Sequence, residues 1–426
     1  MNAAVTTRIS HTALLALALL TAPACGATQD PTDTFAADAT DGTGDVSPPV
    51  DATAADATSP FGPDVWHTRV ELGQVQTGFD GKTPPVTFVV PPGTTSFVLS
   101  VHGPDAWQYT LAALAGPSNL SIVPKFWLDG GPGSPWLCLD NCANRIASSP
   151  AEAQFLVPNT PLLQVQTGEH TVQAYAFDYV PPQGSVVGQR SPQLAKVELA
   201  VDFVGKPAEL RKLGRLDVNL CLTGAAGITA AIALEHPRVS AALDEVRQRL
   251  AEAQLELGEV RAFDVPAEQL IFTHDASADA ELSALYRTGA GLPPGLNVFL
   301  VDAVQVAAKQ GIPTLVLGLA GGIPGPLYVG GPRSGVVLSL QAAPQGLLLG
   351  RAMAHEIGHY LGLFHSSEEH LSGQSSVHDN LPDTPEQDPD NLMFWLVNDT
   401  SAGKLTPQQA DVLHHNPWVA PVLETP

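Results

Sequence analysis

Residues 65–205 alternate between hydrophobic and polar positions in short runs separated by glycine and proline. Successive side chains of a strand point to opposite faces, so this period of two predicts strands with one buried face. The runs fall at residues 86–90, 96–101, 170–177 and 196–203. Many short strands with frequent turn residues favour an all-β, antiparallel, sandwich-like domain. The pattern leaves the role of this domain open between a packing spacer and a module that binds a substrate or a surface.

Residues 206–426 show the mixed pattern of an α/β (α+β) domain. Hydrophobic residues recur at intervals of three and four from 239 to 257, which predicts a long helix, and Gly258 stands where a C-terminal capping glycine is expected. A second helix is expected to begin near Gln345. Apolar runs predict strands at residues 215–222, 259–265, 296–301 and 335–340, with a glycine- and proline-rich loop at 318–326. This order describes a twisted mixed sheet with one helix behind it and the second helix after its last strand.

The first 64 residues differ in composition from both domains. Residues 1–25 combine Arg8, a short apolar run and small residues before Cys25, which is typical of a signal peptide rather than a membrane span. Cys25 resembles a bacterial lipobox cysteine, so lipidation and plain secretion both remain open. Residues 26–64 are rich in Asp, Thr, Ala and Pro and contain neither Lys nor Arg, which predicts a disordered tether. We therefore expect an exported bacterial protein, either a cell-surface or outer-membrane lipoprotein or a secreted form.

Charge and composition narrow the range of partners. A hydrophobic content of 44% is ample for two folded cores. The net charge of −23, with only 20 Lys and Arg and no basic run, argues against nucleic acid, because binding phosphates requires clustered cations. Outside the signal peptide no stretch is apolar and long enough to span a bilayer, so membrane contact is expected only through an N-terminal lipid anchor. We expect a monomer.

The four cysteines carry different expectations. Cys138 and Cys142 are close enough in sequence to close a small disulfide loop, which an exported protein permits. Two ligands of a metal site are the alternative, but no second pair or neighbouring histidine accompanies them. Cys221 lies in an apolar, strand-like run and is expected to be a buried small hydrophobe.

Residues 354–365 carry the motif H-E-x-x-H-x-x-G-x-x-H, formed by His355, Glu356, His359, Gly362 and His365. At this chain's composition the full motif arises by chance in roughly 5 of 100,000 chains of this length, against about 2 in 100 for H-E-x-x-H alone. Histidines four residues apart project from one face of a helix, and a glycine permits the left-handed turn that returns the third histidine. Three protein ligands leave a fourth position for water, which is the catalytic arrangement of zinc. Glu356 is placed to accept a proton from that zinc-bound water.

The motif is similar to that of the metzincin superfamily of zinc endopeptidases, whose members carry a methionine in a tight turn below the metal. Of the three methionines, only Met393 follows the third histidine, so the resemblance implies that it forms this Met-turn. Residues 378–385 (HDNLPDTP) and 405–410 (LTPQQA) resemble the pappalysin and cytophagalysin branch. The resemblance covers about residues 213–418 and departs at Trp395, where many relatives have a tyrosine that assists at the metal.

The resemblance implies a zinc endopeptidase that hydrolyses peptide bonds in a protein or peptide substrate. His355, His359 and His365 would bind Zn²⁺, and Glu356 would act as the general base. Residues 318–334 would form the sheet edge on which an extended substrate lies. A catalytically silent binding or adhesion protein with the same fold is the alternative, although such proteins commonly lose the glutamate. A zinc hydrolase with a non-peptide substrate is a third interpretation.

A short acidic loop follows the motif. It contains four aspartates: Asp379, Asp383, Asp388 and Asp390. Carboxylate oxygens are ligands that Ca²⁺ prefers, with Asp379 and Asp383 as the candidates, and a bound ion would fix the segment between His365 and Met393. A solvated loop with Asp-Pro turns is the alternative.

Overall fold

The computed structural model of the protein describes residues 61, 65–124, 144–180, 189–206, 212–266, 271–274, 280–306, 314–369 and 376–422. The predicted signal peptide, most of the predicted tether, Cys25, Cys138 and Cys142 lie outside the described residues. Export, lipidation and a disulfide therefore stay predictions. No helix in the described ranges is long and apolar enough to cross a membrane.

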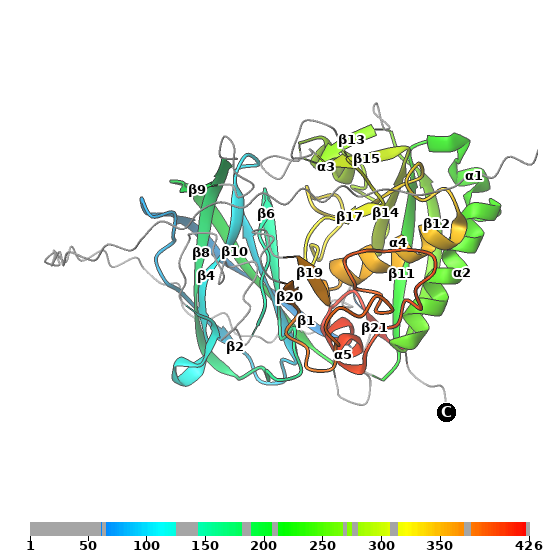
Figure 1. Ribbon diagram of the computed structural model, residues 1–426. Helices are drawn as coiled ribbons and strands as arrows, with labels where there is room; N and C mark the ends of the chain where they lie inside the picture. The colour runs from blue at the N-terminus through cyan, green and yellow to red at the C-terminus, as the bar shows by residue number, and fades with distance from the viewer. Residues whose placement is uncertain are drawn as a thin grey trace, which may run out of the picture. The chain divides into compact units, whose positions relative to one another are not determined.

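Two antiparallel sheets form the β region, residues 66–205, and share one hydrophobic core (Figure 1). The first contains, in order, β1 (Trp66–Gln76), β10 (Lys196–Gly205), β3 (Ser96–His102) and β7 (Glu152–Val157). The second contains, in order, β2 (Val86–Val90), β8 (Gly168–Val180), β4 (Gln108–Ala115) and β5 (Ser121–Val123). Two short strands extend it, β6 (Ser149–Pro150) beside β4 and β9 (Gln189–Pro192) beside β8. A short 3-10 helix, η1 (Pro117–Asn119), precedes β5. Phe97 and Phe155 of the first sheet meet Leu111 and Ala174 of the second in this core. The period of two thus gives each sheet a buried face.

A six-stranded mixed sheet forms the centre of the α/β region, residues 214–421. Its strands are, in order, β12 (Leu255–Asp264), β11 (Gly214–Leu222), β14 (Leu296–Val301), β18 (Val336–Ser339) and β17 (Gly318–Ala320), with β21 (Ala420–Pro421) beside β11. The first four are parallel, and β17 runs antiparallel to β18 at the edge. Two smaller sheets are formed by β13 (Ile271–His274), β15 (Ala303–Val306) and β16 (Thr314–Val316), and by β19 (Ser367–Glu369) and β20 (Ser376–His378).

Helices pack on both faces of the central sheet, which explains why β14 is apolar at successive positions. The helices are η3 (Ala225–Gly227), α1 (Ala230–Ala233), α2 (Pro237–Glu252), α3 (Ala280–Arg287), α4 (Gly346–Tyr360) and α5 (Pro407–His415). On one face Val298 and Leu300 share a core with α2 and α4, which contact each other (Figure 1). On the other face Phe299 packs against Tyr286 of α3. The protein therefore has mixed α and β structure, with extensive sheets and few helices.

The predicted end of the long helix near residue 257 is wrong. Helix α2 ends at Glu252, Gln254 adopts a left-handed conformation with φ of 57°, and β12 begins at Leu255. The apolar residues here fit a period of two as well as the helical period, and pairing with β11 decides between the two. Gly258 is therefore not a helix cap. It lies in β12, where a Cβ would come within 2.1 Å of a carboxylate oxygen of β11.

Contacts between the β region and the α/β region cross the boundaries predicted from the sequence. Phe61, inside the predicted tether, is 3% exposed and packs edge-on against Trp418 at a centroid distance of 5.4 Å, so the tether ends before this residue. Lys206, at the predicted domain boundary, is buried, and its ammonium donates to three carbonyls at and just beyond the end of α5. Val98 and Val204 of the first sheet belong to the same core as α2 and α4.

Candidate metal centre

Helix α4 presents the first two histidines of the motif, and the turn after it presents the third. The helix ends at Tyr360, and Gly362 follows with φ of 115°. Glycine reaches this conformation at little steric cost, which confirms the turn predicted from the motif. The amides of Gly362 and the next residue donate to carbonyls of the last helical turn. The chain therefore folds back and brings His365 beside His355 and His359.

Hydrogen bonds fix the orientation of all three imidazole rings. Each Nδ1 atom faces an acceptor: Leu392 O at 2.7 Å from His355, Leu363 O at 2.7 Å from His359, and Glu368 Oε2 at 2.9 Å from His365. Carbonyl and carboxylate oxygens only accept hydrogen bonds, so each Nδ1 carries the proton. Each Nε2 atom is then left with its lone pair available to a metal.

The three Nε2 atoms converge. His355 Nε2 and His365 Nε2 lie 3.3 Å apart, and the ligand atoms of all three histidines lie within 4.8 Å of one another. Two lone pairs at that distance repel unless a cation lies between them. Nitrogen ligands of a tetrahedral zinc ion, each about 2.0–2.1 Å from it, are about 3.3–3.4 Å apart. The three side chains therefore fit a zinc ion, and they form the one group of three or more His, Cys, Asp or Glu with metal-binding geometry in the described ranges.

Burial keeps two of these rings neutral. Burial, together with the neighbouring His365, lowers the pKa of His355 to about 3. Burial likewise lowers the pKa of His359, with the other two rings acting in the same direction. A metal binds the neutral imidazole, so the site favours the form that it needs.

The side chain of Glu356, on helix α4, contacts the edge strand β17. The side chain is buried, and its carboxylate accepts a hydrogen bond from the backbone amide of Ala320 in β17. Burial raises the pKa of Glu356 to about 8, while the Ala320 amide acts to lower it. Gly318 of the same strand lies so near that a Cβ there would be 3.0 Å from the Glu356 Cγ atom. The carboxylate thus has a fixed position beside both the histidines and the free edge of the sheet.

Met393 lies in a turn directly against the helix that carries the motif. Its side chain is buried, and a Cβ on Gly358 would lie 2.5 Å from its sulfur. The Met393 amide donates to Asn391 Oδ1 at 2.9 Å, and its carbonyl accepts from the Ser366 amide at 2.9 Å. The preceding carbonyl is the one that holds His355. The turn therefore packs against the motif helix and, through the carbonyl before Met393, holds the His355 ring.

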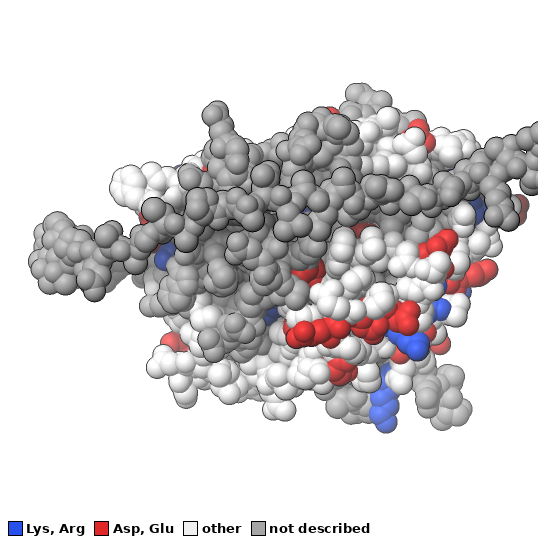
Figure 2. Space-filling view, viewed as in Figure 1, with Lys and Arg blue, Asp and Glu red and all other residues white. Residues whose placement is uncertain are grey.

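The aspartates of the acidic loop make turn and cap contacts. Asp383 accepts from Thr406 Oγ1 at 2.8 Å and from the Gln408 amide at 2.9 Å, which caps the start of α5. Asp379 accepts from the Leu381 amide at 3.1 Å and from a nearby threonine hydroxyl. The structure does not bring these carboxylates together as a calcium site. Figure 2 shows that acidic side chains form a band on one face of the molecule, with few Lys or Arg beside it.

Two further residues at the site carry no motif signal. Glu368 in β19 bridges His365, at 2.9 Å, and Arg145 of the β region, at 2.7 Å. Burial acts to raise the pKa of Glu368, but the hydrogen bond with His365 and the charge of Arg145 outweigh it and lower the pKa to about 2. In Figure 1, β19 and β20 lie between the strands of the β region and helix α4. The only local hint is a carboxylate three residues after the third histidine, and nothing in the sequence near Arg145 points to this contact.

The loop after β17 is also attached to the β region. Tyr328 donates to Glu152 Oε2 at 2.5 Å, and Arg333 Nε donates to the Pro150 carbonyl at 3.0 Å. Glu152 is 3% exposed, and burial raises the pKa of its carboxyl, while hydrogen bonds from Tyr328 and a glutamine act in the opposite direction. The loop that follows the edge strand is thus attached to the β region.

Comparisons with known proteins add limited information. No family model and no curated protein matches the chain. Among solved structures, a metalloproteinase-II from Bacteroides fragilis is similar with a TM-score of 0.31 and 16% identity, over 49% of this chain and 54% of that one, so the chain spans about half of its length. A family two carbohydrate esterase from Clostridium thermocellum is similar with a TM-score of 0.15 and 11% identity, over 55% of this chain and 65% of that one. A family two carbohydrate esterase from Cellvibrio japonicus is similar with a TM-score of 0.14 and 10% identity, over 56% of this chain and 68% of that one.

Proposed function

We propose that the protein is a zinc-dependent endopeptidase. The observation that carries this proposal is the convergence of three histidine Nε2 atoms, each freed for a metal by a hydrogen bond at its Nδ1 atom. His355, His359 and His365 would hold the ion, and Glu356 beside them supplies a carboxylate for proton transfer. Three protein ligands leave room for water, which is the arrangement of catalytic rather than structural zinc.

Glu356 performs the proton transfers of this mechanism. When bound, zinc supplies Lewis acidity, which polarises a peptide carbonyl and lowers the pKa of a coordinated water. The Glu356 carboxylate, oriented by the Ala320 amide, takes a proton from water as its oxygen attacks the carbonyl carbon. Glu356 then delivers the proton to the departing amine.

Strand β17 supports a peptide as the substrate. Among the described strands it pairs only with β18, so its other edge, apart from the Ala320 amide that contacts Glu356, can add an extended chain by backbone hydrogen bonds. Ala320 of this strand contacts Glu356, so a peptide lying along the edge would pass the proposed base. We further propose that the protein is exported, either tethered through a lipid at Cys25 or secreted, which the composition of residues 1–64 supports. We also propose that it acts as a monomer.

Zinc content and peptide cleavage test the proposal together. The full-length chain is the right protein to use, because Phe61 belongs to the core. We expect about one zinc per chain, and cleavage of a mixed peptide library by the wild type. Glu356→Ala should retain zinc and lose about 100- to 10,000-fold in rate. Glu235→Ala, which changes an exposed glutamate, is the matched control and should cleave normally.

Three outcomes separate the hypotheses. A wild type without zinc, or equal cleavage by the Glu356→Ala protein, contradicts the proposal. Zinc without cleavage of any peptide favours the alternative of a silent binding protein. Zinc with cleavage of a non-peptide ester or amide alone favours a hydrolase of another class.

A further inference from the structure

The third histidine of the metal centre differs from the other two in what holds its ring. His355 and His359 donate to backbone carbonyls, whereas His365 donates to the Glu368 carboxylate at 2.9 Å. The other oxygen of that carboxylate accepts from Arg145 Nη2 at 2.7 Å. Two hydrogen bonds in series therefore connect a candidate zinc ligand to the β region, across a sequence separation of 223 residues between Arg145 and Glu368.

Arg145 is fixed at both its side chain and its backbone. The residue is 2% exposed, and its Nη1 donates to the His378 carbonyl at 3.3 Å. The guanidinium lies 4.3 Å from the centroid of the Phe364 ring, the residue before His365. The Arg145 amide donates to Asn159 Oδ1 at 3.1 Å, and Asn159 Nδ2 donates back to the Arg145 carbonyl at 2.5 Å. A group held this way can serve as a rigid anchor.

Glu368 needs such an anchor. It lies in the short strand β19, and its side chain is 27% exposed, so the fold does not enclose it as it encloses Arg145. A carboxylate that holds the Nδ1 of a metal-binding histidine sets both the orientation and the basicity of that ring. Without Arg145 the Glu368 side chain could adopt several rotamers, and only some of them would keep the hydrogen bond to His365. Restricting the side chain to those rotamers would then cost conformational entropy.

We propose that Arg145 and Glu368 are positioning residues of the metal centre: Arg145 of the β region holds Glu368 in the one orientation in which Glu368 aligns His365 for zinc. This inference rests on the proposed zinc function. It gives the β region a part in forming the site. This role differs from both the packing spacer and the surface-binding module that the sequence pattern left open. Both residues act through His365 and neither contacts the substrate.

Zinc affinity of the full-length chain tests this directly. The variants are Glu368→Gln, Arg145→Met and Arg145→Lys, measured by competition with a chromophoric chelator and by the visible absorption spectrum of the Co²⁺-loaded protein. Glu368→Gln and Arg145→Met should weaken zinc binding about 10- to 100-fold and change the Co²⁺ spectrum. Arg145→Lys keeps the charge but not the guanidinium, whose two terminal nitrogens contact Glu368 and the His378 carbonyl. Its zinc affinity should lie between those of the other two variants and that of the wild type.

Arg287→Met is the matched control. Arg287 pairs with Asp105 at 2.8 Å and also joins the α/β region to the β region, but both side chains are exposed, at 43% and 59%. Its zinc affinity and Co²⁺ spectrum should equal those of the wild type. The double variant Arg145→Met/Glu368→Gln should bind zinc no more weakly than Glu368→Gln alone, because Arg145 acts through Glu368.

The direction of the change in zinc affinity distinguishes positioning by Arg145 from a purely electrostatic effect of its charge. Arg145 is a cation near a site for a dication, so removal of its charge alone would tighten zinc binding. Unchanged or tighter binding in Arg145→Met, with a normal melting curve of the zinc-free protein, would overturn the inference. If Arg145→Met does not fold, Arg145→Lys and Glu368→Gln decide by the same criterion. A wild type that binds no zinc would overturn the proposed function and this inference together, whereas zinc binding without peptidase activity would overturn the proposed function alone.

Discussion

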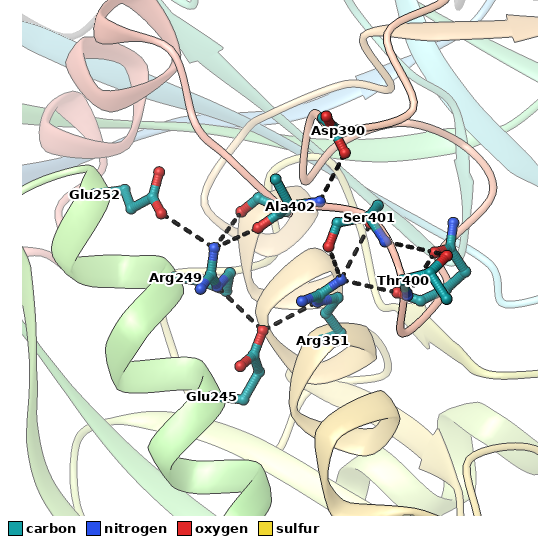
Figure 3. Close-up of polar contacts among 10 residues, drawn as sticks. Glu245, Arg249, Glu252, Arg351, Asp390, Thr400, Ser401 and Ala402 are labelled. Atoms are coloured by element: carbon teal, nitrogen blue, oxygen red, sulfur yellow. Dashed lines mark hydrogen bonds and ion pairs between the residues drawn. The ribbon is translucent and has the colours of Figure 1, made fainter.

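Glu245 is a buried carboxylate between two buried guanidiniums, and its replacement by glutamine gives a sharp test of how α2 and α4 are held together (Figure 3). Its Oε1 lies 3.1 Å from Arg249 Nε and 3.0 Å from Arg351 Nε, and the three side chains are between 5% and 8% exposed. Arg351 Nη1 also donates to the Asn398 carbonyl at 3.2 Å, and Arg249 Nη1 to the Gly403 carbonyl at 3.3 Å. The cluster therefore attaches both helices to the loop that follows the Met393 turn.

Glu245→Gln keeps the shape of the side chain and removes its charge. Arg351 then remains buried without a carboxylate partner, and Arg249 keeps only the partly exposed Glu252, at 3.0 Å. Breaking a buried ion pair from one side costs about 3–5 kcal/mol. A cost of that size lowers the melting temperature by about 6–10 °C at about 2 °C per kcal/mol, the low end of the range for domains of about 150–250 residues. Urea titration of the full-length protein, extrapolated linearly to water, gives the free energy of unfolding directly.

Asp244→Asn makes the same chemical change one residue earlier and serves as the control. Asp244 pairs with Arg247 at 2.9 Å, but these side chains are 72% and 50% exposed. An exposed pair of this kind contributes about 0.2–1 kcal/mol, so this variant should stay close to the wild type. A loss below about 1 kcal/mol in Glu245→Gln, or equal losses in the two variants, would refute the reasoning that burial sets the cost.

Three further substitutions test single features of the fold. Gly362→Ala forces a side chain into a backbone conformation at φ of 115°, so thermal melts should show a loss of about 1–3 kcal/mol, and an unchanged midpoint would contradict the strain. Gly358→Ala places a Cβ 2.5 Å from the Met393 sulfur, and urea titration should show a cost of about 1–3 kcal/mol. Burial raises the pKa of Glu152 above 4.5, so its contribution to stability is present below that pH and is lost as the pH rises through the folded-state pKa. The stability of Glu152→Gln relative to the wild type should therefore increase with pH, by at most about 1.4 kcal/mol per pH unit, and a difference that does not vary with pH would show that Glu152 does not titrate.

The parts of the site that sequence could predict are those encoded within a few consecutive residues. The spacing of His355, His359 and His365 fixes their geometry once a helix and a glycine turn are assumed, and the structure brings them together as that spacing requires. The same holds for β14, whose residues 296–301 are apolar except for Asn297 because helices cover both faces. In each case one local pattern is compatible with one local structure.

The parts that sequence could not predict depend on contacts between distant segments. The end of α2 was misplaced because apolar residues near 255 satisfy two periods, and only the parallel pairing with β11 selects the strand. Phe61 lies in a polar segment whose composition predicts disorder, yet it is buried against Trp418 of the C-terminal segment. In the sequence, little distinguishes Glu368 from the other acidic residues of a chain with a net charge of −23. Its partner, Arg145, is identified only once the two regions are packed together.

The position of these contacts changes the meaning of the domain boundary predicted at residue 206. A cut there would separate Arg145 from Glu368 and Glu152 from Tyr328, and so would release both the loop that carries His365 and the loop beside the edge strand. It would also expose the face of the first β sheet that packs into the core of α2 and α4. The sequence pattern changes at this boundary because the secondary structure changes, from strands alone to strands and helices. The physical unit that forms the candidate metal centre includes residues from both sides of it.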